Sequence, residues 1–238
     1  MASVGSSSAD PGSQHHSSAL RNRAPILEKL QQCSLASAGL ALEIASGTGA
    51  HVEYFSDASP EVTWQPSEYC PAALTAGNDA AFGKIGARGR GLSELDAIDS
   101  VGCKLRKNVE PAVALDASLS FDQWPAAVQS RAGSFGLVYA SNVCHISPWE
   151  VTLGLIAGAA AALRPTGQLI IYGPFKVGGE FTTESNASFD MSLRIRDPSW
   201  GYRDISDLQV EAERRDLKLQ ARHDMPANNF LLVFAKQG

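Results

Sequence analysis

The sequence predicts a Rossmann-like α/β domain, doubly wound, with a mostly parallel seven-stranded sheet that ends in an antiparallel hairpin. Short apolar runs alternate with segments of helical periodicity, which is the pattern of repeated βα units. The first apolar run stops at the glycine-rich segment 46–49, as a parallel strand does when it enters a βα turn. The last two apolar runs are separated only by the short segment 225–228, so we expect them to pair antiparallel.

Two kinds of pattern place the elements of the first half of the chain. Each predicted strand is a short apolar run that ends at a turn or polar residue, and these strands are expected at 40–45, 61–65 and 111–115. The helices are expected at 24–33, 50–56 and 71–81. In the first of these, apolar residues recur at helical spacing and Pro25 suits the first turn, because the proline ring fixes a helical φ angle.

The second half of the chain follows the same alternation. Its strands are expected at 135–141, 168–172, 217–223 and 229–235, and its helices at 150–163, 184–195 and 207–216. The turn at 164–167 leads the chain from a helix into the fifth strand. Asp204 or Ser206 can cap the last helix, since a short polar side chain accepts from the free N–H groups of the first turn.

Composition restricts the class of protein. The 238 residues are enough for one such domain, 44% of them are hydrophobic, and the net charge is −5 without a long basic run. We therefore expect no broad nucleic-acid-binding surface. The four cysteines form no C-x-x-C pair, which predicts reduced thiols in a cytoplasmic protein and no metal site. No apolar stretch reaches transmembrane length, so no membrane association is expected.

The domain boundaries follow from local composition. Residues 1–18 are rich in Ser and Gly with few large apolar side chains, so they are predicted to be a disordered tail. Residues 19–238 are expected to form a single domain. Within it, the stretch around 77–107 is rich in Gly, Ala and charge, and we predict a variable insertion there, most flexible near 84–91.

The loop after the first strand is the strongest candidate for a ligand site. It runs Glu43-Ile44-Ala45-Ser46-Gly47-Thr48-Gly49, and its two glycines let the backbone come close to a ligand. A P-loop is excluded because no Gly-Lys-Ser/Thr follows, and a dinucleotide fingerprint would need glycine where Val52 stands. A nucleoside without a pyrophosphate fits better. The alternative is a βα turn that contains two glycines and binds nothing.

This loop resembles motif I of the class I S-adenosylmethionine-dependent methyltransferases, with Glu43 where Asp is usual and Ala45 where the first Gly is usual. The resemblance implies S-adenosylmethionine as cofactor. The residues expected to bind it are Glu43, Ser46, Gly47, Gly49, Glu68, Asp116 and Asn142. Of these, Glu68 follows the second strand and can accept both ribose hydroxyl protons, and Asp116 follows the third strand, where it would meet the adenine amino group.

Further motifs are similar to those of the methyltransferase-like protein 26 family. They are Arg21-Asn22-Arg23, Pro25-Ile26-Leu27, Asn142, His145-Ile146-Ser147-Pro148-Trp149, Tyr172-Gly173-Pro174-Phe175, Glu184-Ser185-Asn186, Phe189-Asp190, Ser192-Leu193-Arg194, Arg196-Asp197-Pro198, Trp200-Gly201 and Met225-Pro226-Ala227-Asn228-Asn229. The similarity covers the chain from about residue 21 to its end, except for 77–107. It implies the methyltransferase fold and cofactor binding, and it brings no substrate.

Methyl transfer is an in-line displacement in which the acceptor must be held against the methyl group, sometimes with a base that removes its proton. His145 follows the fourth strand and is the candidate base, because histidine titrates near neutrality. The alternative is that His145 orders its own loop. Tyr172, at the end of the fifth strand, is expected to face the same cleft as a second catalytic residue. Cys144 is a better candidate for the core than for a nucleophile.

A polar helix is the candidate acceptor site. Asn186, Asp190 and Arg194 are four residues apart, so they share one face, and Arg196 follows. The arginines would favour an acceptor that carries a carboxylate or phosphate. The alternative is an ordinary salt-bridged surface.

The expected function is therefore methylation of an unidentified small molecule. The Asn-Pro-Pro-Tyr sequence of many base-modifying enzymes is absent after the fourth strand, and the acidic net charge disfavours a nucleic-acid substrate. A non-catalytic module that binds a metabolite or a protein partner stays open as the alternative, because Ala45 departs from the glycine motif and no nucleophile activator is evident. Oligomeric state is not predicted.

Overall fold

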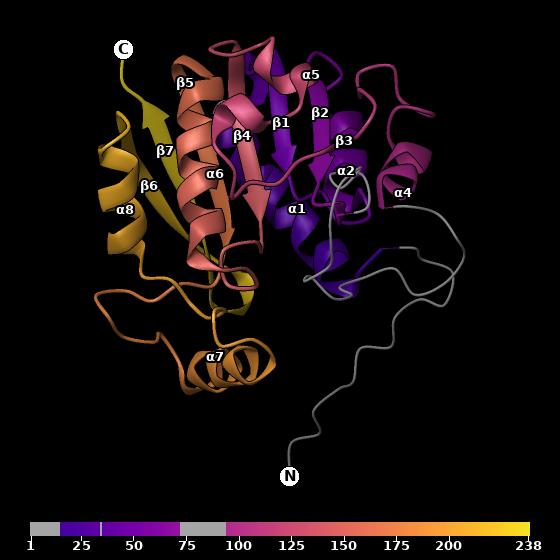
Figure 1. The fold of residues 1–238 in the computed structure, drawn as a ribbon. Helices are drawn as coiled ribbons and strands as arrows, with labels where there is room; N and C mark the ends of the chain where they lie inside the picture. The colour runs from indigo at the N-terminus through magenta and orange to yellow at the C-terminus, as the bar shows by residue number, and fades with distance from the viewer. Residues whose placement is uncertain (1–14, 34, 72–93) are drawn as a thin grey trace.

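The computed structural model describes residues 15–33, 35–71 and 94–238, which form a seven-stranded sheet between two layers of helices (Figure 1). The strand order is β3-β2-β1-β4-β5-β7-β6. The strands are β1 (Leu40–Ile44), β2 (Thr63–Glu68), β3 (Val113–Ala114), β4 (Phe135–Ser141), β5 (Leu163–Gly173), β6 (Leu217–Met225) and β7 (Asn229–Lys236). The predicted fold class is confirmed: β1 to β5 pair in parallel, and β7 is antiparallel to both β5 and β6.

The centre of the sheet is where the strand order reverses. Strand β1 pairs with β2 on one side and with β4 on the other, and four of its five residues are buried. This explains the continuous apolar sequence of β1, because both faces of a central parallel strand are covered. Such a reversal leaves a crevice at the carboxyl ends of the strands, which is where open α/β sheets bind ligands.

The helices cover the sheet on both faces. They are α1 (Ser17–Gln32), η1 (Leu35–Ser37), α2 (Ala50–Ala58), α4 (Glu94–Val101), η2 (Phe121–Gln123), α5 (Ala126–Gln129), α6 (Trp149–Ala162), α7 (Glu184–Arg196), α8 (Ile205–Glu213) and η3 (Pro226–Asn228). One apolar core joins α1, α2 and α4 to the sheet, and a second joins α6 and α8 to its other face. Helix α7 stands apart from both layers, at the end of the sheet to which β4 and β5 point (Figure 1). The predicted cap of α8 is confirmed, since Asp204 accepts from the Ser206 N–H.

Helix α1 begins earlier than predicted. It starts at Ser17, so the predicted tail 1–18 is wrong at Ser17 and Ser18, and its residues 1–14 lie outside the described part of the chain. The prediction that Pro25 sits in the first turn is also wrong, because Pro25 lies inside the helix. The polar first turns of α1 carry no apolar periodicity, which is why the sequence pattern placed the helix start too late.

The stretch 77–107 is partly an integral element of the domain. The predicted helix 71–81 lies outside the described residues except for its first position, as do the residues near 84–91. Residues 94–101, however, form helix α4, which packs on α2 and β2 with Ile98 fully buried. The sequence did not predict this helix, because Ile98 and Val101 are its buried residues and two apolar positions give a weak periodic signal.

Across the described ranges, no helix combines the length and apolar character needed to cross a membrane.

Candidate active site

The loop between β1 and α2 depends on left-handed backbone. Ala45, Gly47 and Gly49 have φ angles of 59°, 60° and 82°. A Cβ atom at Gly47 would meet nothing within 4 Å, so this position faces open space. A Cβ atom at Gly49 would lie 2.8 Å from Cγ2 of Val101 in α4, so Gly49 is needed for packing. Ala45 adopts the left-handed conformation at a cost of about 1 kcal/mol, which keeps the loop shape although glycine is usual there.

Two buried polar atoms of this loop have no hydrogen-bond partner among the described residues. They are Oε2 of Glu43 and Oγ of Ser46, whose residues are 1% and 7% exposed. Burial raises the pKa of Glu43 to about 8, so this carboxyl is mostly protonated at neutral pH. Buried polar atoms without partners are costly and therefore rare. A bound ligand with polar groups would supply the missing partners, so the loop fits a nucleoside-type cofactor.

Glu68 lies beside this loop, and Asp116 lies near Tyr69, the residue that follows Glu68. Glu68 at the end of β2 accepts hydrogen bonds from the N–H groups of Gly47 at 2.5 Å and Tyr69 at 2.9 Å. Burial raises the pKa of Glu68 to about 7. Asp116 accepts from the N–H and hydroxyl of Ser118, and its charge adds to burial in raising the pKa of Tyr69. The structure therefore brings Glu68 into direct contact with the glycine loop and places Asp116 near the neighbouring Tyr69.

The ends of β4 and β5 bring Asn142 and His145 together. Asn142 has a φ angle of 58°, and its N–H donates to the Tyr172 carbonyl at 2.8 Å. A Cβ atom built at Gly173 would lie 3.6 Å from Nδ1 of His145 and 3.7 Å from Oδ1 of Asn142. The two predicted residues thus converge on one point at the carboxyl end of the sheet.

His145 is enclosed by aromatic side chains. Only 6% of the residue is exposed, and its ring centroid lies 5.9 Å from that of Phe189 in α7 and 6.1 Å from that of Tyr202. Burial lowers the pKa of His145 to about 4, with a smaller contribution from the nearby Arg203 cation. The imidazole is therefore neutral at physiological pH and has a lone pair with which to accept a proton, but it is a weaker base than the near-neutral histidine expected from the sequence.

Tyr172 lies away from this point. Neighbouring residues of a strand point to opposite faces, so Tyr172 points away from the side on which Gly173 approaches His145. Its side chain packs in the core beneath α1, and its hydroxyl accepts a hydrogen bond from Nδ2 of Asn229 at 3.0 Å. The geometry does not support the prediction that Tyr172 is a second catalytic residue in the His145 cleft.

The polar residues of α7 mainly hold that helix in place. Asp190 is 7% exposed, and its carboxylate accepts from Nε of Arg194 at 2.8 Å and from the Tyr202 N–H at 2.6 Å. Asn186 is also buried and donates to Oγ1 of Thr182 at 2.9 Å. Arg196 is exposed at the end of the helix. These contacts favour the alternative that the sequence left open, a salt-bridged helix, for Asp190 and Arg194.

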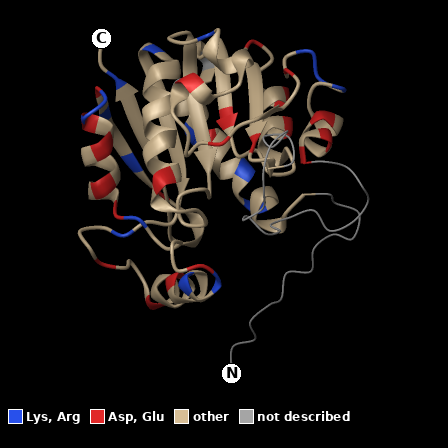
Figure 2. Ribbon diagram, viewed as in Figure 1, with Lys and Arg blue, Asp and Glu red and all other residues tan. Residues whose placement is uncertain are grey.

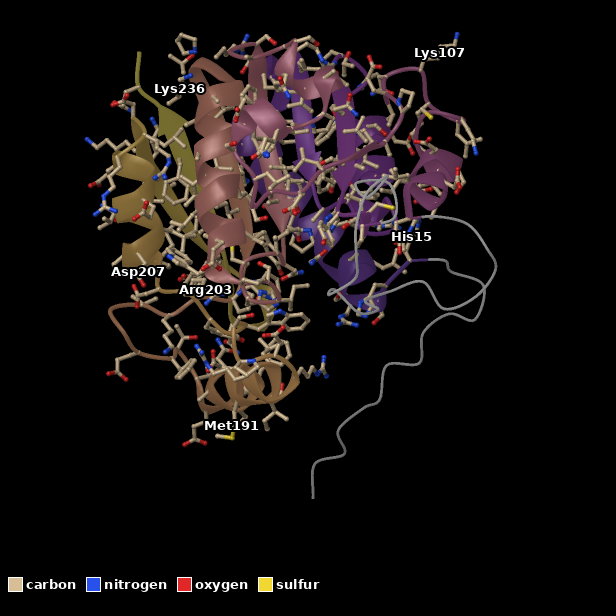
Figure 3. The ribbon with its side chains drawn as sticks, in the orientation of Figure 1. His15, Lys107, Met191, Arg203, Asp207 and Lys236 are labelled. Atoms are coloured by element: carbon tan, nitrogen blue, oxygen red, sulfur yellow. The ribbon has the colours of Figure 1, made fainter. Side chains whose placement is uncertain are left out.

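Arg203 is a residue that the sequence did not single out. Its Nε donates to the Cys144 carbonyl at 3.0 Å, and its Nη2 donates to the carbonyls of Ser147 at 2.6 Å and Ser199 at 2.9 Å. Arg203 therefore ties the loop that carries His145 to the segment after α7, at the junction between the body and α7 (Figure 3). A single arginine that binds backbone carbonyls distant in sequence leaves no local pattern by which it can be found.

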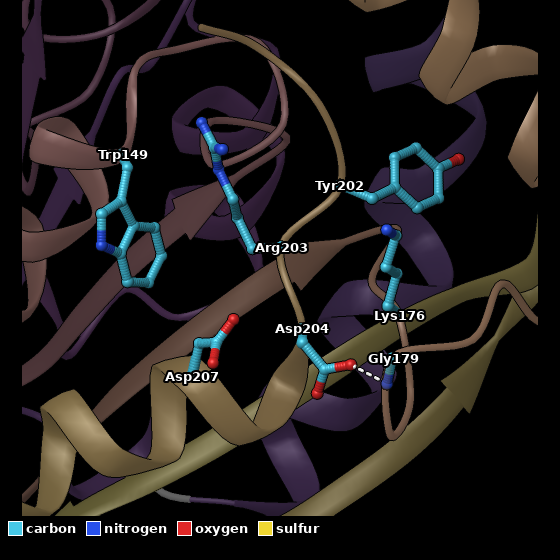
Figure 4. A pocket seen from close by; sticks show the side chains of 7 residues that line it. All are labelled: Trp149, Lys176, Gly179, Tyr202, Arg203, Asp204 and Asp207. Carbon is cyan, nitrogen blue, oxygen red and sulfur yellow. Dashed lines mark hydrogen bonds between the residues drawn. The ribbon is translucent and has the colours of Figure 1, made fainter.

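A hollow of about 370 Å³ lies beside this junction (Figure 4). Its lining residues are Trp149, Lys176, Gly179, Tyr202, Arg203, Asp204 and Asp207. None of them belongs to the glycine loop 43–49. The donors of Arg203 bind carbonyls, and Oδ2 of Asp204 accepts from the Gly179 N–H at 2.5 Å. Because Arg203 and Asp204 are already engaged by these bonds, we assign the hollow no ligand.

Replacing Arg203 tests its role in holding the His145 loop. Arg203→Met should lower the free energy of unfolding by about 1–3 kcal/mol, because three carbonyls, two of them partly buried, lose their charged donor. Urea denaturation followed by circular dichroism measures this change. Arg214→Met is the matched control, since among the described residues the exposed Arg214 pairs only with Glu211, one turn away on its own helix, and its loss should cost less than about 0.5 kcal/mol. Equal losses in the two variants would contradict the assigned role.

Comparison with known proteins gives a family and a fold. The profile of a family described as "Protein of unknown function (DUF938)" matches residues 13–236. An O-methyltransferase family protein from Burkholderia thailandensis superposes with a TM-score of 0.67 at 15% identity, over 92% of this chain and 57% of that chain. The mitomycin 7-O-methyltransferase MmcR gives 0.65 at 15% identity, over 92% and 54%.

A third solved structure is that of human N-acetylserotonin methyltransferase in complex with S-adenosylmethionine. It gives a TM-score of 0.60 at 10% identity, over 92% of this chain and 56% of that chain. The present chain thus spans little more than half the length of these three structures. At such low identities the similarity shows a shared methyltransferase fold.

Proposed function

This chain belongs to the DUF938 family of proteins of unknown function, and from that starting point we propose that it is an S-adenosylmethionine-dependent methyltransferase that acts on a small molecule. The observation that carries the proposal is the open face of Gly47, which lies beside Glu68 and the unpartnered buried atoms of Glu43 and Ser46. The shared fold of known methyltransferases supports it. The motifs similar to the methyltransferase-like protein 26 family support the finer assignment to that group.

The residues of the loop and the strand ends would hold S-adenosylmethionine. Gly47 gives the cofactor close access to the backbone, and Glu68 would accept from the ribose hydroxyls. Asp116 and Asn142, which follow β3 and β4 in the chain, would meet the adenine and the remaining polar groups. The bound cofactor supplies an electrophilic methyl group on its sulfonium.

His145 would then serve as the base. Its neutral imidazole can take the proton that the acceptor loses when its oxygen or nitrogen bonds to the methyl carbon. We place the acceptor between α7 and the end of β4, where Phe189 is 40% exposed and its ring lies 5.9 Å from that of His145. Asn186, Asp190 and Arg194 would support this site by fixing α7, and the exposed Arg196 is the group left to meet an anionic acceptor.

The charge distribution supports a small acceptor over a polynucleotide. Lys and Arg positions are scattered among Asp and Glu positions over the ribbon (Figure 2). Phosphate backbones bind to continuous basic surfaces, and the net charge here is −5. We also propose a cytoplasmic location, which the four unpaired cysteines support.

Calorimetric titration of the full chain with S-adenosylmethionine tests the proposal. We expect saturable binding with one site per chain, followed by conversion of the cofactor to S-adenosylhomocysteine when a cell extract supplies acceptors. No binding would overturn the proposed function. Binding without turnover across extracts and acceptor screens would favour the alternative of a non-catalytic module.

Glu68 offers a more specific check. Glu68→Ala should weaken S-adenosylmethionine binding about tenfold or more, because each hydrogen bond to a charged acceptor contributes about 1.5–3 kcal/mol. The parent affinity should rise as pH rises through about 7, since the pKa of Glu68 is raised to that value and the ionised form is the better acceptor. Glu61→Ala, an exposed glutamate before the opposite end of β2, is the control. An unchanged affinity in Glu68→Ala would exclude the ribose contact.

A further inference from the structure

A chain of buried polar side chains joins α1 to the glycine loop. Asn22 in α1, His51 in the first turn of α2 and Glu43 at the end of β1 are 9%, 6% and 1% exposed. Nε2 of His51 lies 2.7 Å from Oδ1 of Asn22, and Nδ1 of His51 lies 3.7 Å from Oε1 of Glu43. The three residues come from separate elements, so their contact depends on the complete fold.

The partner of each atom determines the proton arrangement. An amide oxygen can only accept, so Nε2 of His51 carries the proton that it donates to Asn22. Nδ1 then carries a lone pair and faces the Glu43 carboxyl. The Tyr139 hydroxyl lies 3.4 Å from the same Nδ1 atom. The His51 ring is held flat against Phe55, with centroids 5.3 Å apart and an interplanar angle of 3°. His51 therefore has a fixed tautomer and a fixed orientation.

The two carboxyl oxygens of Glu43 have different surroundings. Oε1 faces Nδ1 of His51, whereas Oε2 is buried and has no hydrogen-bond partner within residues 15–33, 35–71 and 94–238. Glu43 lies four residues before Gly47, where an added Cβ atom would meet nothing within 4 Å. The Ser46 hydroxyl and the Val52 N–H also act on this carboxyl and lower its pKa against the larger effect of burial. With Oε1 beside His51 and no partner among the described residues within hydrogen-bond distance of Oε2, the carboxyl is arranged to receive a ligand atom.

We propose that His51 is a positioning residue for the cofactor site: Asn22 fixes its orientation, and His51 in turn aims the Glu43 carboxyl so that Oε2 meets the bound cofactor. The proposal rests on the proposed function, because it assigns S-adenosylmethionine as the ligand. It makes α1 part of the binding apparatus through Asn22, because α1 packs against α2, the helix that follows the loop.

A double-mutant cycle on cofactor affinity tests whether His51 acts through Glu43. His51→Phe keeps the stacking on Phe55 and removes both ring nitrogens. We expect this variant to weaken S-adenosylmethionine binding about tenfold, and Asn22→Leu to weaken it about fivefold. In a Glu43→Gln background, His51→Phe should change the affinity less than about twofold, because residues that act as a unit are not additive.

Asn108→Ala controls for general destabilisation. The Asn108 amide donates to the carbonyls of Ser56, Ser59 and Val62, near the opposite end of β2 from the glycine loop. This variant should lower the melting temperature and leave the affinity unchanged. For His51→Phe we expect the opposite pattern. Its affinity for S-adenosylmethionine should fall by more than its fall in melting temperature accounts for.

The outcomes are distinguishable. If the parent binds S-adenosylmethionine and His51→Phe binds as the parent does, or loses the same factor in both backgrounds, the positioning role is overturned. If the parent does not bind, the proposed function fails instead. If His51→Phe fails to fold, Asn22→Leu takes its place in the double-mutant cycle with Glu43→Gln. Equal losses of affinity for Asn22→Leu in both backgrounds would then overturn the positioning role.

Discussion

Gly47→Arg is expected to abolish S-adenosylmethionine binding while the protein stays folded. A Cβ atom at Gly47 meets no other atom within 4 Å, so an arginine side chain can extend without a clash into the space assigned to the cofactor. The backbone there has a φ angle of 60°, which costs an L-residue about 1–2 kcal/mol. Calorimetry should show an affinity at least about a hundredfold weaker, equivalent to roughly 2.7 kcal/mol of binding free energy.

Gly39→Arg is the matched control for that experiment. Gly39 has a φ angle of 66°, and a Cβ atom there also meets nothing within 4 Å. It precedes β1 at the amino end, whereas Gly47 follows β1 at the carboxyl end. The two variants carry a similar backbone strain, so they should have similar melting temperatures. Loss of binding in both, or in neither, would contradict a ligand site at Gly47.

His145→Phe is expected to lower kcat by a factor of about 10² to 10⁴, the usual contribution of a general base. Phenylalanine keeps a ring between Phe189 and Tyr202 and removes the proton acceptor. The affinity for S-adenosylmethionine should stay within about twofold of the parent, because the base acts on the acceptor. His223→Phe, on the edge strand β6, is the control and should keep full activity. An unchanged kcat in His145→Phe would assign that residue to loop structure alone.

The pH dependence of turnover gives a second measure of His145. Because burial lowers its pKa to about 4, the base stays in its active neutral form at all pH values above about 5. At saturating cofactor, kcat should therefore be independent of this group from pH 5 upward and fall only as pH drops toward 4. An acidic limb near pH 6.5, the ordinary histidine value, would show that His145 is exposed to water during the reaction.

The strands could be predicted because their signal is local. A continuous apolar run that stops at Gly47 or Asp116 is visible in the sequence, and every predicted strand is present. The start of α1 and helix α4 were not predictable in the same way. Each buries few apolar residues. Helix α4 packs against the loop at Gly49, and such a tertiary contact cannot be seen in the local sequence pattern.

The site could be predicted only as far as strand ends determine it. Glu68 contacts Gly47, and Asn142 and His145 both lie near Gly173, because the carboxyl ends of parallel strands lie along one edge of the sheet. The end of β5 did not determine the facing of Tyr172, which points to the opposite face from the side on which Gly173 approaches His145. Arg203 was missed because it binds carbonyls about 60 residues away in the sequence, and such a contact leaves no spacing to recognise.

The order of the strands also affects how the protein behaves at high concentration. An unpaired sheet edge is a template on which another chain can add a strand and start aggregation. One edge here is β3, which has only two residues. The other edge is β6, whose outward positions include the exposed Lys218, Arg222 and Asp224. A neighbouring molecule would have to bury these charges against its own, so both edges protect the folded protein against edge-to-edge self-association.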